Sequence, residues 1–332
     1  MKTRTLGRTG VSVSELSLGG LFVASFASPL EMAKATVSRA LDLGITYIDT
    51  APTYGNSEEV LGRVLAGEKR PFLLSTKLGG RPQPFKPQDR ACLLASVEES
   101  LRLLGRTSID ILMIHEPDRP GHYDWWADWD EINGPVLEVL DGLRKNGTVR
   151  YTGIGGTTAH ELARFVRSGK FDVVLTAYNY SLLWREAALE IFPAAVEKNV
   201  GIILGSPLQQ GALSRRYDDE VKKGAPWLSK TRREQLIALY ALLDEVGMDI
   251  AEVGLRFVLS NPAVSTVLFG AASPQEVERN VAAANKGPLP APVARRIDEL
   301  AAMVPFRPFE EPAGLGWLLV SPGSYKGPGV AR

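Results

Sequence analysis

The chain has 332 residues, of which 45% are apolar and 23% charged, a composition typical of soluble globular proteins. Lys plus Arg and Asp plus Glu both number 38, so the formal net charge is zero. That balance argues against a nucleic-acid binder, and it gives the protein no net positive charge that would attract it to a membrane surface. The single cysteine, Cys92, excludes an intrachain disulfide and a cysteine-based zinc site.

The first residues carry positive charge, but no apolar segment of the kind found in a secretory signal follows them. No apolar run approaches the roughly 20 residues that a membrane helix needs. We therefore expect a cytoplasmic protein with a small molecule as its partner, and neither nucleic acid nor a membrane. The oligomeric state is left open.

The first predicted element is a small β-hairpin over residues 3–14, whose turn chemistry comes from Gly7 and Gly10. Eight short β-rich runs follow, several of them apolar without alternation, as expected of parallel strands buried on both faces. These runs are Leu16–Leu18, Ile45–Ile48, Phe72–Thr76, Ile109–Ile114, Val149–Ile154, Val173–Thr176, Gly201–Leu204 and Val264–Phe269.

Segments with helical periodicity alternate with these runs. They are Leu30–Leu43, Ser57–Leu65, Pro87–Leu104, Pro135–Lys145, Thr158–Ser168, Leu183–Lys198, Lys230–Val246 and Pro274–Ala284. Two extra helices are expected at Ile250–Leu259 and Pro292–Met303. Residues 304–332 are rich in Pro and Gly, which indicates a surface tail that either lies near the barrel mouth or is mobile.

Eight strand-then-helix units predict an α/β fold, a closed (β/α)8 TIM barrel that forms a single domain over residues 1–332, with the hairpin plugging its lower end. A doubly wound open sheet is the alternative. That fold requires a glycine-rich phosphate turn near the start of the chain. The nearest candidate, residues 153–158, comes late and lacks the third glycine, so we favour the barrel.

Three polar residues stand at the ends of three successive predicted strands: Asp49, Lys77 and His115. The carboxyl ends of barrel strands converge on one mouth, and Tyr54 follows Asp49 closely enough to fold over them. An ammonium group such as Lys77 lowers the pKa of a nearby phenol, which makes Tyr54 a usable acid or base. Asp49 can hold Lys77 in place, and His115 can orient a reacting oxygen.

These residues lie in runs that resemble the aldo-keto reductase superfamily: DTAPTYG at 49–55, STK at 75–77 and ILMIH at 111–115. The segments LGRTGVSVS at 6–14, SPL at 206–208 and GAASPQEVERN at 270–280 carry the resemblance further along the chain. It implies that Asp49, Tyr54, Lys77 and His115 form a catalytic tetrad, with Tyr54 as proton donor or acceptor. It also implies a nicotinamide cofactor.

Several positions depart from the family pattern. The family often has Ser-Asn where this chain has Gly155 and Gly156, Gln where it has Leu175, and an aromatic residue where it has Gly205. Backbone groups and Asn179 are therefore expected to take a larger part in holding the nicotinamide. The same variants resemble the sugar-oxidising branch of the family, which includes D-threo-aldose 1-dehydrogenase, L-fucose dehydrogenase and L-galactose dehydrogenase.

The resemblance implies a set of cofactor contacts spread over the ends of several strands. The set is Gly20, Leu21, Asp49, Gly155, Asn179, Ser206, Pro207, Leu208, Gly211, Gly270, Ala271, Ala272, Glu276 and Asn280. Family members that prefer NADP commonly have an Arg where this chain has Ala272. A carboxylate such as Glu276 suits the free 2′-hydroxyl of NAD and repels a 2′-phosphate, so we expect NAD. The alternative is NADP, with Arg279 reaching the phosphate.

The long loop after His115 contains Trp125, Trp126 and Trp129, half of the tryptophans in the chain. Aromatic faces stack on sugar C–H surfaces, so together with Tyr54 and His115 these residues are candidate substrate contacts. The alternative interpretation is a loop anchored by buried tryptophans. The His115 to His122 spacing matches no helical pair of metal ligands, and we expect no metal.

These patterns favour an NAD-linked enzyme that oxidises an aldose at its hemiacetal carbon C1 to the lactone. Reduction of small aldehydes or ketones is the nearest alternative, because the same tetrad serves both directions. A Schiff-base lyase would need a depressed pKa at Lys77, which Asp49 opposes. A cofactor-binding regulatory protein without turnover is a further alternative.

Overall fold

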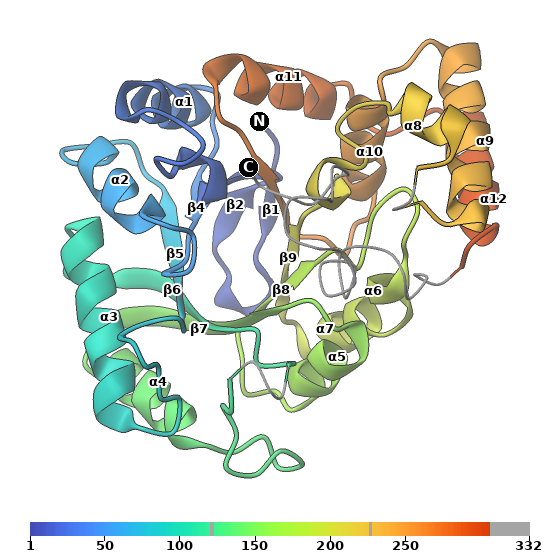
Figure 1. Ribbon diagram of the computed structural model, residues 1–332. Coiled ribbons are helices and arrows are strands. Elements are labelled where there is room, and N and C mark those ends of the chain that lie inside the picture. The colour runs from blue at the N-terminus through green and yellow to red at the C-terminus, as the bar shows by residue number, and fades with distance from the viewer. Residues whose placement is uncertain (120–122, 226–227, 306–332) are drawn as a thin grey trace.

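The computed structural model describes residues 1–119, 123–225 and 228–305. Its centre is a closed barrel of eight parallel strands in the order β10-β3-β4-β5-β6-β7-β8-β9. Helices surround the barrel on its outer side (Figure 1). The (β/α)8 barrel predicted from the alternation is therefore confirmed, and the open-sheet alternative is excluded.

The barrel strands are short and most of their residues are buried. They are β3 (Leu16–Gly19), β4 (Tyr47–Asp49), β5 (Leu73–Leu78), β6 (Ile109–His115), β7 (Val149–Gly156), β8 (Val173–Ala177), β9 (Gly201–Gly205) and β10 (Thr266–Gly270). Each predicted run overlaps one strand. The strands extend past the predicted ends at β5, β6 and β7, so that Lys77, His115 and Gly155 are themselves strand residues.

Ten helices over the described residues lie between or beyond the strands at the predicted places. They are α1 (Leu30–Asp42), α2 (Ser57–Val64), α3 (Arg90–Leu104), α4 (Pro135–Lys145), α5 (Ala159–Arg167), α7 (Ile191–Lys198), α9 (Lys230–Val246), α10 (Ile250–Leu259), α11 (Pro274–Asn285) and α12 (Ala291–Ala302). The two extra helices correspond to α10 and α12. Helix α12 packs against α9 on the outside of the barrel (Figure 1).

Two predicted helix boundaries are wrong for local reasons. The single helix expected over 183–198 is two, α6 (Glu186–Leu189) and α7, with non-helical backbone at Glu190. Pro193 lacks an N–H to donate to the carbonyl of Leu189, which breaks the helix there. The helix expected from Pro87 begins at Arg90, because the side chain of Asp89 caps it by accepting from the backbone of Ala91 at 2.9 Å.

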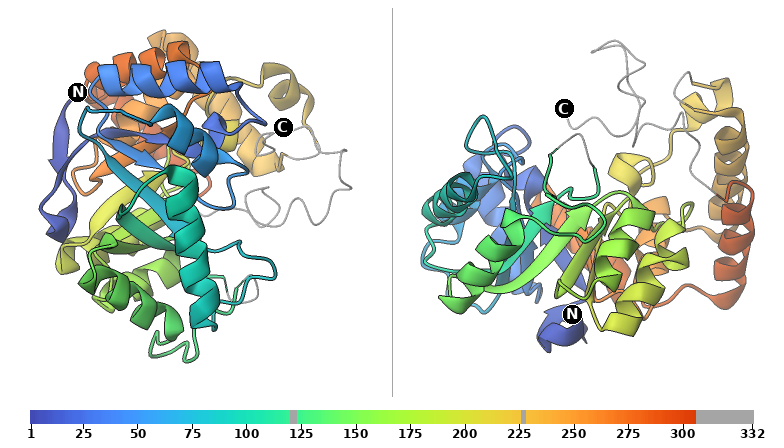
Figure 2. Two further views of the ribbon diagram at one scale, coloured as in Figure 1. Left: turned by 90° about the vertical axis from the view of Figure 1, so that its left-hand side faces the viewer. Right: turned by 90° about the horizontal axis from the view of Figure 1, so that it is seen from below.

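The predicted hairpin consists of β1 (Thr3–Thr5) and β2 (Ser12–Ser14), paired antiparallel. It lies at the end of the barrel opposite to the loops that follow the strands (Figure 2). Leu6, between the two strands, is fully buried in a cluster with barrel-interior residues such as Ile111 and Val173. The hairpin therefore closes the lower end, and the carboxyl ends of the strands form the mouth.

Short elements were not predicted: the 3-10 turns η1 (Gly7–Thr9), η2 (Gly20–Val23) and η3 (Gln209–Gly211), and the helix α8 (Asp218–Lys223). Most of the expected tail over 304–332, from residue 306 onward, lies outside the described residues. Across the described parts of the chain, no helix is both long and apolar enough to cross a membrane.

Candidate active site

Asp49, Lys77 and His115 lie at the carboxyl ends of β4, β5 and β6, three adjacent strands of the barrel. Lys77 and Asp49 are almost completely buried, with exposed fractions of 1% and 2%. Lys77 Nζ donates to Asp49 Oδ2 at 2.6 Å. The barrel register thus brings together two charged groups that are separated by a whole strand-helix unit in the sequence.

The ammonium group of Lys77 has three protons and three acceptors. One proton goes to Asp49, a second to the carbonyl oxygen of Thr50 at 2.8 Å, and a third to the hydroxyl oxygen of Tyr54. The Tyr54 oxygen therefore accepts from Lys77, and its own proton remains for another acceptor. Lys77 Nζ lies 4.8 Å from the centroid of the Tyr54 ring.

His115 completes the group. Its ring meets that of Tyr54 edge to face, with centroids 6.0 Å apart, and its Nδ1 lies 3.3 Å from the hydroxyl oxygen of Thr53. Tyr54 and His115 are both half-buried, whereas Lys77 and Asp49 lie beneath them. A substrate oxygen at the mouth would thus meet the phenol and the imidazole, while the ion pair supports the phenol from below.

The pKa of Tyr54 is raised above its ordinary value, which differs from the expectation. Burial raises it, Lys77 lowers it, and Asp49 raises it again. The predicted contact with Lys77 is present, but Asp49 offsets much of its charge. The phenol is consequently protonated at neutral pH in the ligand-free protein.

Lys77 is charged at neutral pH. Burial lowers its pKa, but Asp49 and Tyr54 together outweigh burial, and the pKa ends above its usual value. A lysine that forms a Schiff base must be deprotonated and free to attack. Lys77 is neither, which weighs against the lyase alternative.

The predicted cofactor residues all lie around the same mouth. Gly20 and Leu21 begin η2 after β3, Gly155 is the penultimate residue of β7, Asn179 follows β8, and Ser206, Pro207, Leu208 and Gly211 follow β9. Gly270 ends β10, Ala271 and Ala272 follow it, and Glu276 and Asn280 are on α11. Gly20 is also required by packing, since a Cβ there would lie 2.7 Å from the carbonyl oxygen of Asp49.

Several residues at the mouth have features that are compatible with a bound ligand. Gly155 faces the barrel interior, where a Cβ would lie 3.6 Å from Lys77 Cε, so the glycine adds no side chain of its own beside Lys77. Ser206, Gln209 and Gln210 have positive φ angles near 51°, a strained backbone of the kind that clusters at ligand sites. Gln209 Oε1 is buried without a hydrogen-bond partner among the described residues.

The tryptophans of the long loop differ from their expected role. Trp125 and Trp126 are buried, and their indole N–H groups donate to the carbonyl oxygens of His115 and Pro117. Trp126 and Trp129 both pack against Phe165 of α5. This arrangement favours the alternative interpretation, a loop anchored by tryptophans, while a substrate contact for the half-buried Trp129 stays a prediction.

Sequence reasoning missed Asp118 as a structural residue of the mouth. It is buried, and its Oδ2 accepts from the backbone N–H of Thr157 at 2.8 Å and of Thr158. Its carboxylate occupies the space that a Cβ on Gly156 would take. The unusual Gly155-Gly156 pair was the available signal, because the second glycine makes room for Asp118. The described residues contain no cluster of three or more side chains suited to a metal ion.

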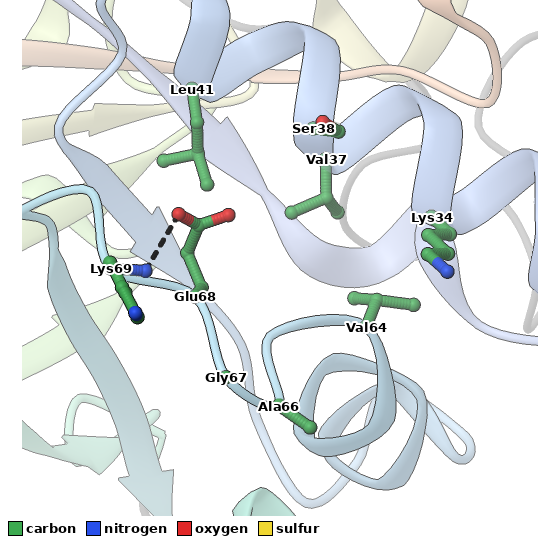
Figure 3. A pocket seen from close by; sticks show the side chains of 9 residues that line it. All are labelled: Lys34, Val37, Ser38, Leu41, Val64, Ala66, Gly67, Glu68 and Lys69. Carbon is green, nitrogen blue, oxygen red and sulfur yellow. Dashed lines mark hydrogen bonds between the residues drawn. The ribbon is translucent and has the colours of Figure 1, made fainter.

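A surface cavity of about 310 Å³ lies away from the mouth, between α1 and the segment after α2 (Figure 3). Its lining includes Lys34, Val64 and Glu68, and none of the predicted site residues. The Glu68 carboxylate accepts from the backbone of Lys69 and from Arg70, which together lower its pKa to about 2. The cavity contains an internally paired carboxylate and no group that joins the tetrad.

Comparison with known proteins identifies related sequences over most of the chain. Residues 15–302 match the Aldo/keto reductase family. L-galactose dehydrogenase of Arabidopsis thaliana is 31% identical over 294 residues, which cover 85% of this chain and 88% of that protein. D-threo-aldose 1-dehydrogenase of Pseudomonas sp is 29% identical over 302 residues, which cover 82% and 89%.

A solved structure supports the same relationship. The holo form of an aldo-keto reductase from Bacillus halodurans aligns with a TM-score of 0.73 and 27% sequence identity. The alignment covers 94% of this chain and 100% of that one.

Proposed function

The chain belongs to the aldo/keto reductase family, and from that premise we propose that it oxidises an aldose at C1 to the lactone, with NAD as hydride acceptor. As a member of the family it is an NAD(P)-dependent oxidoreductase acting on CH–OH groups. The substrate and the choice of NAD are the parts we propose. Two relatives that match over most of their length are a galactose and an aldose dehydrogenase, which supports the sugar substrate.

The observation that carries the proposal is the complete coordination of Lys77. With all three ammonium protons directed to Asp49, Thr50 and Tyr54, the Tyr54 hydroxyl keeps its own proton for exchange with a substrate oxygen. During oxidation, Tyr54 as phenolate takes the proton of the C1 hydroxyl, while His115 orients that oxygen. A nicotinamide bound in its oxidised form would supply the acceptor for the hydride from C1, and loss of that hydride and of the hydroxyl proton turns the C1–O bond into the lactone carbonyl.

A positively charged cofactor bound at the mouth would lower the pKa of Tyr54 and so favour its phenolate form. Burial keeps the Tyr54 pKa above its ordinary value in the free protein. The positive charge of oxidised nicotinamide would act in the same direction as Lys77 and stabilise the phenolate. Oxidation should therefore increase as pH rises toward the Tyr54 pKa, whereas carbonyl reduction, which needs the phenol proton, should decrease.

The choice of NAD rests on the junction between β10 and α11. Glu276 Oε2 accepts from the backbone N–H of Ala272 at 2.9 Å, which holds a carboxylate beside the residue where a 2′-phosphate would need a cation. A carboxylate there accepts from a free ribose hydroxyl and repels a phosphate. The contacts of Gly155, Asn179, Ser206 and the other mouth residues with the cofactor are likewise part of the proposal.

The experiment that tests the proposal is formation of reduced nicotinamide with L-fucose, D-arabinose and L-galactose, with NAD and NADP in parallel. We expect turnover with NAD on at least one sugar. Tyr54→Phe should then lower kcat by about 10²- to 10⁴-fold, the usual contribution of a general acid or base. The cofactor Kd, measured by protein fluorescence, should change by less than about twofold, since the lost interaction belongs to the transition state.

Tyr151→Phe is the matched control. Its hydroxyl donates to the carbonyl oxygen of Thr9 at the closed end of the barrel, so the variant loses a phenol hydrogen bond away from the mouth. Its kcat should equal that of the wild type. Full activity in Tyr54→Phe would refute the proton-transfer role. Turnover only in the reverse assay, with small aldehydes and reduced cofactor, would establish the reductase alternative.

A further inference from the structure

Two hydroxyl groups lie directly beneath Asp49 inside the barrel. The Ser75 hydroxyl, on β5, lies 2.6 Å from Asp49 Oδ1, and the Tyr47 hydroxyl, on β4, lies 2.7 Å from Ser75 Oγ. Tyr47 and Ser75 have no exposed surface. The role assigned to the tetrad uses neither group.

The carboxylate fixes the direction of donation along this chain of groups. An ionised carboxylate only accepts, so the single proton of Ser75 goes to Asp49 Oδ1. Ser75 Oγ must then accept from Tyr47. Burial raises the pKa of Tyr47 well above its ordinary value, and the charge of Asp49 raises it further, so Tyr47 keeps the proton that it donates.

Both oxygens of Asp49 are consequently occupied from opposite sides. Ser75 donates to Oδ1 and Lys77 donates to Oδ2, each at 2.6 Å. The Lys77 ammonium in turn donates a hydrogen bond to the Tyr54 hydroxyl oxygen. A continuous series of hydrogen bonds thus runs from the buried phenol of Tyr47 to the phenol at the mouth, and such series strengthen their members cooperatively in a dry interior.

We propose that Ser75, supported by Tyr47, is a positioning residue that holds Asp49 with Oδ2 toward Lys77 and thereby controls the proton affinity of Tyr54. Ser75 acts through Tyr54, so its role rests on the proposed function of that phenol. It touches neither substrate nor cofactor.

Removal of the Ser75 hydroxyl has a definite electrostatic consequence. The negative charge of Asp49 loses a donor that partly offsets it, and Asp49 raises the pKa of Tyr54. The other groups that face Tyr54 are Lys77, His115 and Tyr178, and the substitution removes none of their charges or hydroxyls. The pKa of Tyr54 should therefore move upward.

The direct test is an NMR titration of tyrosine labelled with carbon-13 at Cζ, in the cofactor-free full-length protein. Tyr54→Phe identifies the signal. In Ser75→Ala we expect the Tyr54 midpoint to rise by about half a pH unit, the scale of one lost hydrogen bond transmitted through a neighbour. In parallel, the midpoint of the rise in oxidation rate with pH should move to higher pH. The kcat at neutral pH should fall about threefold, and the cofactor Kd should stay unchanged.

Ser17→Ala is the matched control. Ser17 on β3 is equally buried, and its hydroxyl pairs with that of Thr266 on β10, away from the tetrad. It should lower the unfolding temperature as Ser75→Ala does, and leave the Tyr54 midpoint where it is. Tyr47→Phe keeps the ring and the Ser75–Asp49 bond, and should shift the midpoint in the same direction by a smaller amount.

The outcomes separate the possibilities. An unchanged Tyr54 midpoint in both Ser75→Ala and Tyr47→Phe would overturn the proposal and leave the two hydroxyls a purely structural role. If Ser75→Ala does not fold, the Tyr47→Phe titration decides. A raised midpoint in a protein that oxidises no aldose would support the positioning role while refuting the proposed substrate.

Discussion

At the scale of single residues, the direction of the Tyr54 pKa shift differs between the sequence-based expectation and the structure. The strand-end pattern predicted that Lys77 would contact Tyr54, and the two groups are in contact. It also predicted a lowered phenol pKa, and that was wrong. The result depends on how far Tyr54 is buried and on how much of the Lys77 charge Asp49 offsets, and neither quantity is encoded in residue spacing. The contact was predictable and the sum of three opposing effects was not.

The buried ion pair makes Lys77 a residue on which both activity and stability depend. Lys77→Met removes one partner and leaves the Asp49 charge buried without its counterion, which should lower the free energy of unfolding by about 3–5 kcal/mol. Asp49→Asn added to Lys77→Met removes the stranded charge, so we expect it to recover part of that stability in urea unfolding. Both variants should be inactive, because Tyr54 has lost the ammonium that orients its proton.

A double-mutant cycle checks this reasoning. If the second substitution destabilises the protein further, instead of recovering stability, then the Asp49 carboxylate is not a destabilising charge once Lys77 is absent. Equal stability of the wild type and Lys77→Met would show that water reaches Asp49 when Lys77 is absent.

At the scale of elements, the repeating alternation of apolar runs and helical segments was sufficient to predict all eight barrel strands. Boundaries were less predictable where one side chain competes with the helix, as the Asp89 cap and Pro193 show. Asp118 illustrates a stronger limit. It caps the start of α5 from a different loop, 39 residues earlier than Thr157. Periodicity within one segment contains no information about such a partner.

The junction of β10 and α11 carries a prediction about cofactor choice. Ser273 accepts from the N–H of Glu276, and the Glu276 carboxylate accepts from that of Ala272, so the charge is held at the helix start. Glu276→Gln keeps an acceptor for the Ala272 N–H and removes the charge. Combined with Ala272→Arg, it should raise the ratio of kcat/KM with NADP to that with NAD about tenfold, the effect of one charge-assisted hydrogen bond.

Glu278→Gln is the control on the same helix, since Glu278 is exposed and pairs with Arg39 on the outer surface at 2.8 Å. It changes the net charge by as much as Glu276→Gln alone and should leave the cofactor ratio unaltered. An unaltered ratio in the double variant would mean that the ribose lies elsewhere. In that case Arg279→Gln should be measured for loss of NADP use.

For the whole molecule, closure of the barrel decides which residues meet. The order of strands alone predicted that Asp49, Lys77 and His115 share one mouth, because parallel strands all end there. It did not single out Ser75 and Tyr47, whose contact depends on the register in which Tyr47 pairs with Leu73 and Asp49 pairs with Ser75. Residues at the mouth can be inferred from strand ends, whereas interior partners require the closed geometry.

The two ends of the barrel should therefore separate stability from catalysis. Leu6 of the hairpin is fully buried at the closed end, against Gly201 and the interior cluster. Leu6→Ala leaves a cavity there and should lower the free energy of unfolding by about 2–5 kcal/mol. Because Tyr54 lies at the other end, kcat and the pH midpoint of oxidation should equal those of the wild type at temperatures where the variant is folded.

Urea unfolding and initial rates on the same Leu6→Ala preparation provide the comparison, with Ser75→Ala as its counterpart. In the Ser75 variant, the pH midpoint of oxidation should shift while the free energy of unfolding falls only modestly. In the Leu6 variant, the free energy of unfolding should fall further while the pH midpoint stays unchanged. A shifted midpoint in Leu6→Ala would show that packing at the closed end reaches the tetrad through Tyr47, which shares the interior cluster with Leu6. The barrel would then act as one coupled unit, and the separation of its two ends would be refuted.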